Sequence, residues 1–324
     1  RRQRQMCIRD SIKGGNIIMM KRFLCGAMAT ALVVAGLSVG SVDASAATKV
    51  PKAKYTFKLN KASKKVVAVT RKGDDKSKFT AKNVKKNGFE GCGVLPKANK
   101  KIKLKYKGKA LYLDRSSSYG AELKGVKLGK GSWTVSFWVK PDTTLGDFMP
   151  MFFTGNNITN PAKTKWISIT KGGSSWPAGG AVPTIWSHNV KKASKGKVTS
   201  EEFPWYGYQN DDGEWQGASD TAKAVGVNPG KWTQVTLVVD TKDTVEYGTK
   251  GEDGYVKSYH GWTYVNGQLF GNGAIAHNTM SNSNKFFLGM NCWDAPFKGS
   301  FKKVQFWKKA LSGKQVLANY KKTK

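Results

Sequence analysis

The sequence is poor in histidine, cysteine and acidic residues, and each scarcity argues against a class of function. Three histidines, His188, His260 and His277, form no His-x-x-x-His pair, and the four cysteines form no Cys-x-x-Cys motif. A zinc site is therefore not indicated. Acidic residues number 21 against 55 lysines and arginines. There is also no Gly-rich phosphate loop before a helix, so a P-loop enzyme is not indicated.

One long apolar run stands near the start of the chain. Met19-Met20-Lys21-Arg22 and the apolar stretch after it lead to Ala44-Ser45-Ala46, the small-residue pattern of a cleavage site. We expect residues 19–47 to be a secretory signal peptide; the alternative is a transmembrane anchor, but no stop-transfer pattern follows. The mature protein is then secreted and extracellular, without a membrane span. Removing residues 1–47 leaves a net charge of +29, so the basic character belongs to the folded part.

Residues 1–18 precede this signal peptide and call for a separate explanation. Back-translation of residues 1–11 resembles a transposase sequencing adapter, and Lys13-Gly14-Gly15 can be encoded by a ribosome-binding site. We interpret residues 1–18 as an adapter and untranslated leader. The arginines among them then say nothing about function.

Two cysteines, Cys92 and Cys292, remain after the leader. In an exported protein they can form a disulfide that closes a long loop. The alternative is two small unpaired core residues. The sequence leaves both open.

Short segments of alternating or continuous apolar character dominate residues 48–324. They predict many short β-strands and a single β-sandwich or jelly-roll domain. Asn266-Gly267 predicts a type I′ hairpin turn, and only residues 310–320 have a helical pattern. The expected strands are 54–59, 101–106, 110–113, 133–139, 166–169, 234–239, 262–265, 286–288 and 301–307.

Lysines alternate with apolar residues along several of these segments. Such lysines keep sheet edges from pairing with other chains, and they can also form an anion-binding face. Export, the spread of lysines along strands and the lack of a recognition motif argue against nucleic acid as a partner.

Seven segments stand in a characteristic order and spacing: residues 108–114, 119–123, 132–141, 231–235, 264–267, 297–307 and 310–312. Taken together, they resemble the concanavalin A-like lectin/glucanase superfamily in its laminin-G-like form. The resemblance implies an all-β, two-sheet antiparallel jelly-roll sandwich with one short C-terminal helix, and it covers residues 54–320. Two lysines, at 302–303, stand where the family often has an Asp, and the stretch 155–230 is longer than the compact family core needs.

Glucanases of this superfamily use a Glu-x-Asp run, which places two carboxylates on one face of a strand. No such run is present. Asp240, Asp243 and Glu246 are spaced by three and are expected in a solvated turn. The sequence therefore favours a non-catalytic protein.

Calcium is the one cofactor left open, because laminin-G-like domains often hold it. Oxygen ligands could come from loop-like positions, although ordinary turn carboxylates explain the same residues. These positions are Asp114, Asp142, Asn156, Asn157, Asp211, Asp212 and Asp294.

Two segments rich in aromatic residues form the candidate carbohydrate site. Sugars have apolar faces and hydroxyl edges, which suit flat aromatic rings flanked by amides and carboxylates. The alternative is that these aromatics fill the sandwich or cap its open end, which is the expected role of Trp133, Trp138, Trp232, Trp262 and Trp307. The candidate ligand-binding residues are Trp176, Trp186, Trp205, Tyr206, Tyr208, Asp211, Asp212, Trp215, Trp293 and Asp294.

Three functions follow as hypotheses. The first is a secreted, non-catalytic carbohydrate-binding or adhesion module that recognises a glycan. The second is an enzyme that acts on an anionic polysaccharide, which the net charge would attract. The third is a surface protein held on anionic cell-wall polymers by its lysines, including those at the C-terminal end of the chain.

Overall fold

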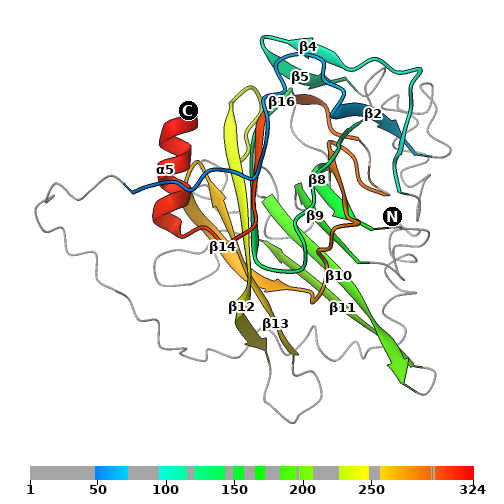
Figure 1. Ribbon diagram of the computed structural model, residues 1–324, viewed down its shortest axis with the longest axis vertical. Coiled ribbons are helices and arrows are strands. Elements are labelled where there is room, and N and C mark those ends of the chain that lie inside the picture. The colour runs from blue at the N-terminus through cyan, green and yellow to red at the C-terminus, as the bar shows by residue number, and fades with distance from the viewer. Residues whose placement is uncertain are drawn as a thin grey trace, which may run out of the picture.

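The computed structural model describes residues 48–71, 95–114, 120–142, 149–156, 165–171, 183–194, 197–206, 226–247, 256–292, 294 and 296–324. Two antiparallel sheets form the domain, and Figure 1 shows a helix near the C-terminus, which is the one helix among these residues. The predicted all-β sandwich with one short C-terminal helix is confirmed. Within these residues, no helix has both the length and the apolar character needed to cross a membrane.

The first sheet, sheet A, is built around β7 and β16, which pair with each other. β1 (Tyr55–Phe57) also pairs with β16, beyond the short segment that pairs with β5. The strand order is β14 (Gln268–Ile275), β13 (Val256–Val265), β12 (Thr233–Tyr247), β7 (Trp133–Pro141), β16 (Gly299–Trp307), β5 (Ala110–Leu113) and β4 (Lys105–Lys107).

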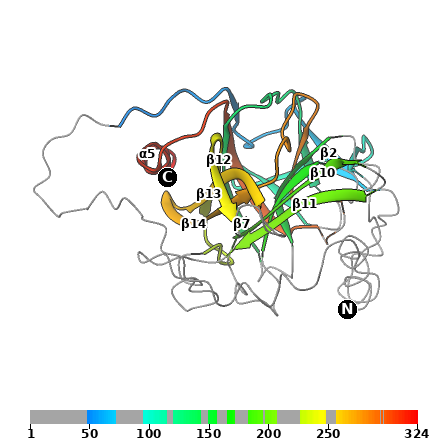
Figure 2. The ribbon, with the colours of Figure 1, turned by 90° about the horizontal axis from the view of Figure 1, so that it is seen from below.

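The second sheet, sheet B, faces sheet A, and Figure 2 shows the two as separate layers. Several of its strands were not predicted, because their apolar runs are short or interrupted by Lys and Gly. The order is β11 (Lys197–Tyr206), β10 (Pro183–Ser194), β9 (Trp166–Lys171), β8 (Pro150–Gly155), β15 (Lys285–Leu288), β6 (Gly120–Leu123), β2 (Val66–Thr70) and β3 (Lys97–Ala98).

The core lies between the sheets and is rich in phenylalanine. Alternate residues of each strand enter it, because successive side chains of a strand point to opposite faces. Phe152 of β8 stacks on Phe137 of β7, with ring centroids 6.0 Å apart and an interplanar angle of 17°. Phe286 and Phe306 also pack against the Phe152 ring. Each of these four side chains is fully buried.

The helix α5 (Gly313–Thr323) packs on the outer face of sheet A. Its Val316 joins Val238, Tyr264 and Trp307 in a buried cluster, and the extended segment before β1 completes that cluster. Figure 1 shows this segment running beside α5. The helix begins three residues later than predicted, because Ser312 caps it.

Ser312→Ala tests this cap. The Ser312 hydroxyl accepts a hydrogen bond from the Gln315 N–H, and the Gln315 side chain accepts one from the Ser312 N–H. Loss of such a capping box costs about 1 kcal/mol, and we expect a decrease of this size in the free energy of unfolding. Chemical denaturation measures it, with Lys314→Ala in the same helix as the control. Equal values for the two variants would contradict the role of the cap.

The hairpin between β13 and β14 turns at the predicted position. Asn266 and Gly267 both have positive φ, 52° and 82°. These are the angles that a type I′ turn requires, so the prediction is confirmed.

Candidate functional site

The side of sheet B that faces away from sheet A carries a regular set of side chains, buried except for Trp186, which we call the β9–β10 face. It consists of three cross-strand pairs: Trp166 with His188, Ser168 with Trp186, and Thr170 with Thr184. The intervening residues Ile167, Ile169 and Ile185 lie in the core. Because side chains alternate along a strand, the three pairs lie on the opposite side of the sheet, away from the core.

Aromatic rings line one part of this face. The rings of Trp166 and His188 are stacked, with centroids 5.5 Å apart and an interplanar angle of 12°. Phe153 of β8 packs against Trp166 at 6.5 Å. Trp186 is half-buried and packs against the same cluster. The result is a cluster of packed aromatic rings in which Trp186 is the more exposed member. Aromatic rings are the kind of group that suits the C–H face of a sugar.

Three hydroxyl groups lie beside the rings. The side-chain oxygens of Ser168, Thr170 and Thr184 are buried, and they have no hydrogen-bond partner in the described part of the chain. A buried hydroxyl without a partner costs about 1–3 kcal/mol, so these groups favour a polar partner. A sugar hydroxyl can both donate to and accept from them.

The structure places only some of the predicted carbohydrate ligands. Trp186 lies on the β9–β10 face. Trp205 and Tyr206 belong to β11, where the register pairs Trp205 with Ile185 and Tyr206 with Thr184. Residues 201–206 are therefore strand. Six further predicted residues lie outside the described residues: Trp176, Tyr208, Asp211, Asp212, Trp215 and Trp293.

Asp294 is 4% exposed, and its described contacts hold a turn together. Its carboxylate accepts a hydrogen bond from the Asn291 amide at 2.8 Å, and its backbone N–H donates to the Asn291 Oδ1 at 2.7 Å. The Arg71 guanidinium donates to the Asp294 carbonyl at 2.9 Å. These contacts give Asp294 a structural role at this turn.

Cys292 is fully buried in the cluster against which Trp186 packs. Cys92, its predicted disulfide partner, lies outside the described residues. The disulfide stays a prediction.

The described calcium candidates have contacts of their own. Asp114 forms an ion pair with Lys105 at 2.6 Å, and Asp142 accepts a hydrogen bond from the Tyr112 hydroxyl at 2.6 Å. That bond and burial are the main causes that raise the pKa of Tyr112 to about 12. The Asn156 amide contacts the Ser281 hydroxyl. Across the described ranges, no group of three or more His, Cys, Asp or Glu side chains could hold a metal ion.

The tryptophans expected in the interior fall into two groups. Trp133, Trp138 and Trp307 are buried, which confirms that prediction. Trp232 and Trp262 are half-buried, and Trp262 packs against the buried cluster of Val238, Tyr264 and Trp307. Trp262 stacks on His260 at 4.0 Å, and Trp232 lies under two lysine ammonium groups. Trp232 is next to Lys231 and follows a Pro-Gly turn, which marks a strand end rather than its buried centre.

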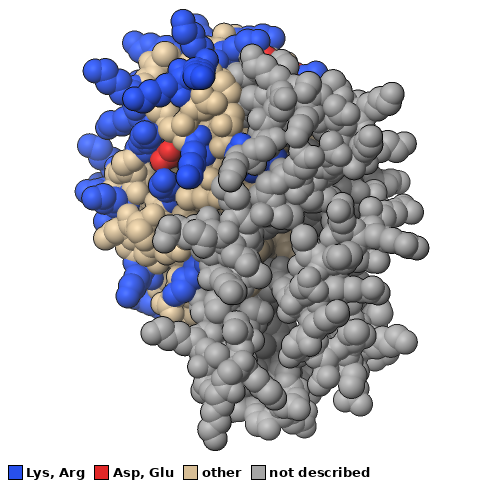
Figure 3. Space-filling model, turned by 90° about the vertical axis from the view of Figure 1, so that its right-hand side faces the viewer, with Lys and Arg blue, Asp and Glu red and all other residues tan. Residues whose placement is uncertain are grey.

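Basic side chains dominate the described surface. Figure 3 shows Lys and Arg gathered on the described part of one face, with few acidic side chains among them. The two lysines of β4, Lys105 and Lys107, are exposed. Many lysines of the described ranges are therefore presented to solvent.

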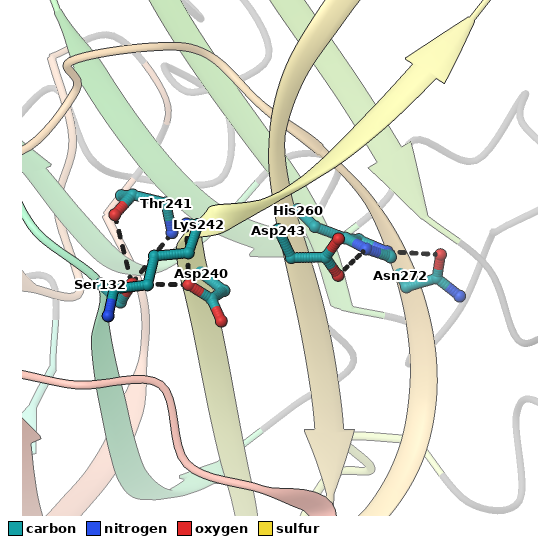
Figure 4. A network of polar contacts seen from close by, with 7 residues as sticks. All are labelled: Ser132, Asp240, Thr241, Lys242, Asp243, His260 and Asn272. Carbon is teal, nitrogen blue, oxygen red and sulfur yellow. Dashed lines mark hydrogen bonds and ion pairs between the residues drawn. The ribbon is translucent and has the colours of Figure 1, made fainter.

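The carboxylates of residues 240–246 lie in a strand rather than in the predicted solvated turn. β12 continues through them to Tyr247, with a register shift between Asp240 and Thr244. The Ser132 hydroxyl and the Lys242 N–H both donate to Asp240 (Figure 4). Burial raises the pKa of Asp240, but these hydrogen bonds outweigh it and bring the pKa below its ordinary value.

His260 lies beside this bulge and bridges three strands. One ring nitrogen is 3.0 Å from Asp243 of β12, and the other is 3.1 Å from the Asn272 side-chain oxygen of β14 (Figure 4). Both ring nitrogens therefore have partners, and the network ties β12, β13 and β14 together at the edge of sheet A.

Comparisons with known proteins agree with this fold. The family model of the concanavalin A-like lectin/glucanases superfamily matches residues 115–317. Domain 4 of AbnA, an extracellular arabinanase of Geobacillus stearothermophilus in complex with arabinotriose, is 22% identical with a TM-score of 0.41; the match covers 64% of this chain and 74% of that one.

Two other solved structures are more distant in sequence. The CBM40 domain of a Ruminococcus gnavus sialidase, bound to sialyllactose, is 12% identical over 59% of this chain and 84% of that one, with a TM-score of 0.35. The receptor-binding domain of botulinum neurotoxin type G is 14% identical over 72% of this chain and 49% of that one, with a TM-score of 0.37. None of these matches transfers a ligand to this chain.

A comparison with curated protein sequences found no significant match. The family match covers more than half of the chain, and the two antiparallel sheets fit the family's fold. The chain belongs to the concanavalin A-like lectin/glucanase superfamily.

Proposed function

We propose that the protein is a secreted, non-catalytic carbohydrate-binding module that uses the β9–β10 face. The observation that carries the proposal is the pairing of stacked aromatic rings with three buried hydroxyls on one side of sheet B. A sugar needs both kinds of contact, an apolar platform for its ring and polar partners for its hydroxyls. Membership of a superfamily that includes lectins supports the same conclusion.

The proposal includes the processing of the chain. Removal of residues 19–47 would release a single domain of residues 48–324 outside the cell. Mass measurement of the protein recovered from the medium of an expressing bacterium tests this step. A mass that includes residues 19–47 would contradict it.

Replacing Thr170 and Thr184 by Val tests the site. Valine keeps the shape of threonine but removes the hydroxyl, so the free energy of unfolding should hold or rise, because a buried unsatisfied group is lost. If the hydroxyls bind a sugar, each substitution should weaken affinity about fivefold, since a hydrogen bond contributes roughly 1 kcal/mol. A glycan array identifies the ligand, and calorimetry then measures the affinity of each variant.

Thr263→Val is the matched control. Thr263 also has a buried hydroxyl without a partner in the described part of the chain, but it belongs to β13 of sheet A. The Thr263→Val variant should leave glycan affinity unchanged. The proposal fails if the array shows no ligand, or if all three threonine variants bind as the unsubstituted protein does.

A further inference from the structure

β16 contains two consecutive lysines that both stay outside the core. Phe301 and Val304, on either side of Lys302 and Lys303, are fully buried. Strict alternation would send one of the two lysines inward. A register shift between Lys302 and Gln305 prevents this, and Lys303 takes a left-handed φ of 47° within it. This is a β-bulge, a local irregularity that redirects side chains.

Aromatic rings hold the first of these lysines in place. The Lys302 ammonium lies 4.6 Å from the ring centre of Trp232 and 4.8 Å from that of Trp138. The Lys140 ammonium lies 5.5 Å from the same Trp232 ring. Trp138 is itself fixed by stacking on Tyr320 of α5 at 5.7 Å. Cation–π contacts position an ammonium group but do not cancel its charge.

The charges of the bulge are not neutralised by the described carboxylates. The ion pairs found in the described part of the chain are those of Lys105, Lys257 and His260. Burial and the nearby Lys140 lower the pKa of Lys302. Burial, together with Lys322, Lys58 and Lys302, lowers the pKa of Lys303. Cations from several elements thus repel one another here, and a bound anion would relieve that repulsion.

We propose that this surface binds the oxyanion groups of an acidic polysaccharide. We call it the lysine bulge surface. The site goes beyond the proposed function, because it belongs to sheet A and is built from different residues. Its members are Lys58, Lys140, Trp232, Lys302, Lys303 and Lys322.

The arrangement favours a polymer over a small anion. The lysines come from the segment after β1, from β7 and β16, and from α5, so the charges are spread over several elements. Neighbouring strands lie about 4.8 Å apart, so the lysine charges on them are spaced out. Repeated acidic groups along a polymer are spaced out in the same way. Nucleic acid is less suited, because lysines and Tyr320 contact the Trp232 and Trp138 rings on which bases would have to stack.

Heparin binding tests the proposal, with the full chain and a sulfated heparin oligosaccharide as the probe. The double variant Lys302→Gln/Lys303→Gln should weaken binding about 100-fold at roughly 0.15 M salt, about tenfold for each charge-assisted contact. The control Lys97→Gln/Lys285→Gln removes the same charge from sheet B, and it should change affinity less than about threefold. Thr184→Val should leave heparin binding intact, which separates this site from the β9–β10 face.

A second variant tests the same surface in case the first variant misfolds at the bulge. Lys140→Gln/Lys322→Gln leaves the strand residues 302 and 303 unchanged, and it should also weaken heparin binding by more than tenfold. The proposal is overturned if both sheet A variants and the sheet B control lose the same affinity, since net charge alone would then explain binding. It is equally overturned if single-stranded DNA of matched charge binds as tightly as heparin and its affinity falls by the same factor in the sheet A variants.

Discussion

Gly299→Ala is expected to lower the free energy of unfolding by several kcal/mol. Gly299 has a φ of 142°, a conformation that side chains with a Cβ rarely adopt. An added Cβ would lie 2.4 Å from the Lys140 carbonyl oxygen and 2.9 Å from the Pro141 Cα. Both obstacles are backbone atoms of β7, so the strands must separate. Backbone strain and overpacking each cost about 1–3 kcal/mol.

Urea unfolding followed by tryptophan fluorescence measures this loss, and Gly131→Ala is the matched control. A Cβ at Gly131 meets nothing within 4 Å, and its φ is not in the left-handed region. The control should therefore change stability by less than about 0.5 kcal/mol. If Gly299→Ala were as stable as the control, the close pairing of β16 with β7 at this point would be wrong.

Phe152→Ala is expected to cost about 3–5 kcal/mol, the range for an aromatic side chain lost from a packed core. The Phe152 ring contacts rings of β7, β15 and β16, so it joins the two sheets. Its removal leaves a cavity that the surrounding strands cannot close, because each is held by its own ladder of hydrogen bonds.

The midpoint of thermal unfolding reports this loss, at roughly 2–4 °C per kcal/mol for a domain of this size. Leu269→Ala serves as the control, because Leu269 is 53% exposed on β14, at the edge of sheet A. We expect almost no shift from it. Equal shifts in the two variants would mean that Phe152 is not part of the core.

Several elements of the fold could be predicted because local chemistry decides them. Asn266-Gly267 fixed the hairpin, since both residues tolerate positive φ. Continuous apolar segments such as 133–139 predicted the central strands. β10 and β11 were missed because they alternate weakly and contain charged residues, so their pairing depends on neighbours in the sheet.

The candidate site was only partly predictable. Trp186 was identified as a ligand candidate, but its neighbours Trp166, Ser168 and Thr184 were not, because threonine and serine in a strand carry no functional signal. Their significance comes from the register of β9 and β10, which places three pairs on one face. The lysine bulge had a visible sign in the sequence. Two lysines stand together between Phe301 and Val304, which interrupts the alternation of inward and outward residues along the strand.

The sequence by itself determined the superfamily, the sandwich and the basic surface. The reason is that composition, and the alternation of inward and outward residues, act within each strand. Only the tertiary structure decided which side chains meet. The β9–β10 face and the lysine bulge surface depend on strand register, and a shift of one residue turns a side chain to the opposite face. Register is fixed by contacts between segments far apart in the chain, such as β16 with β7.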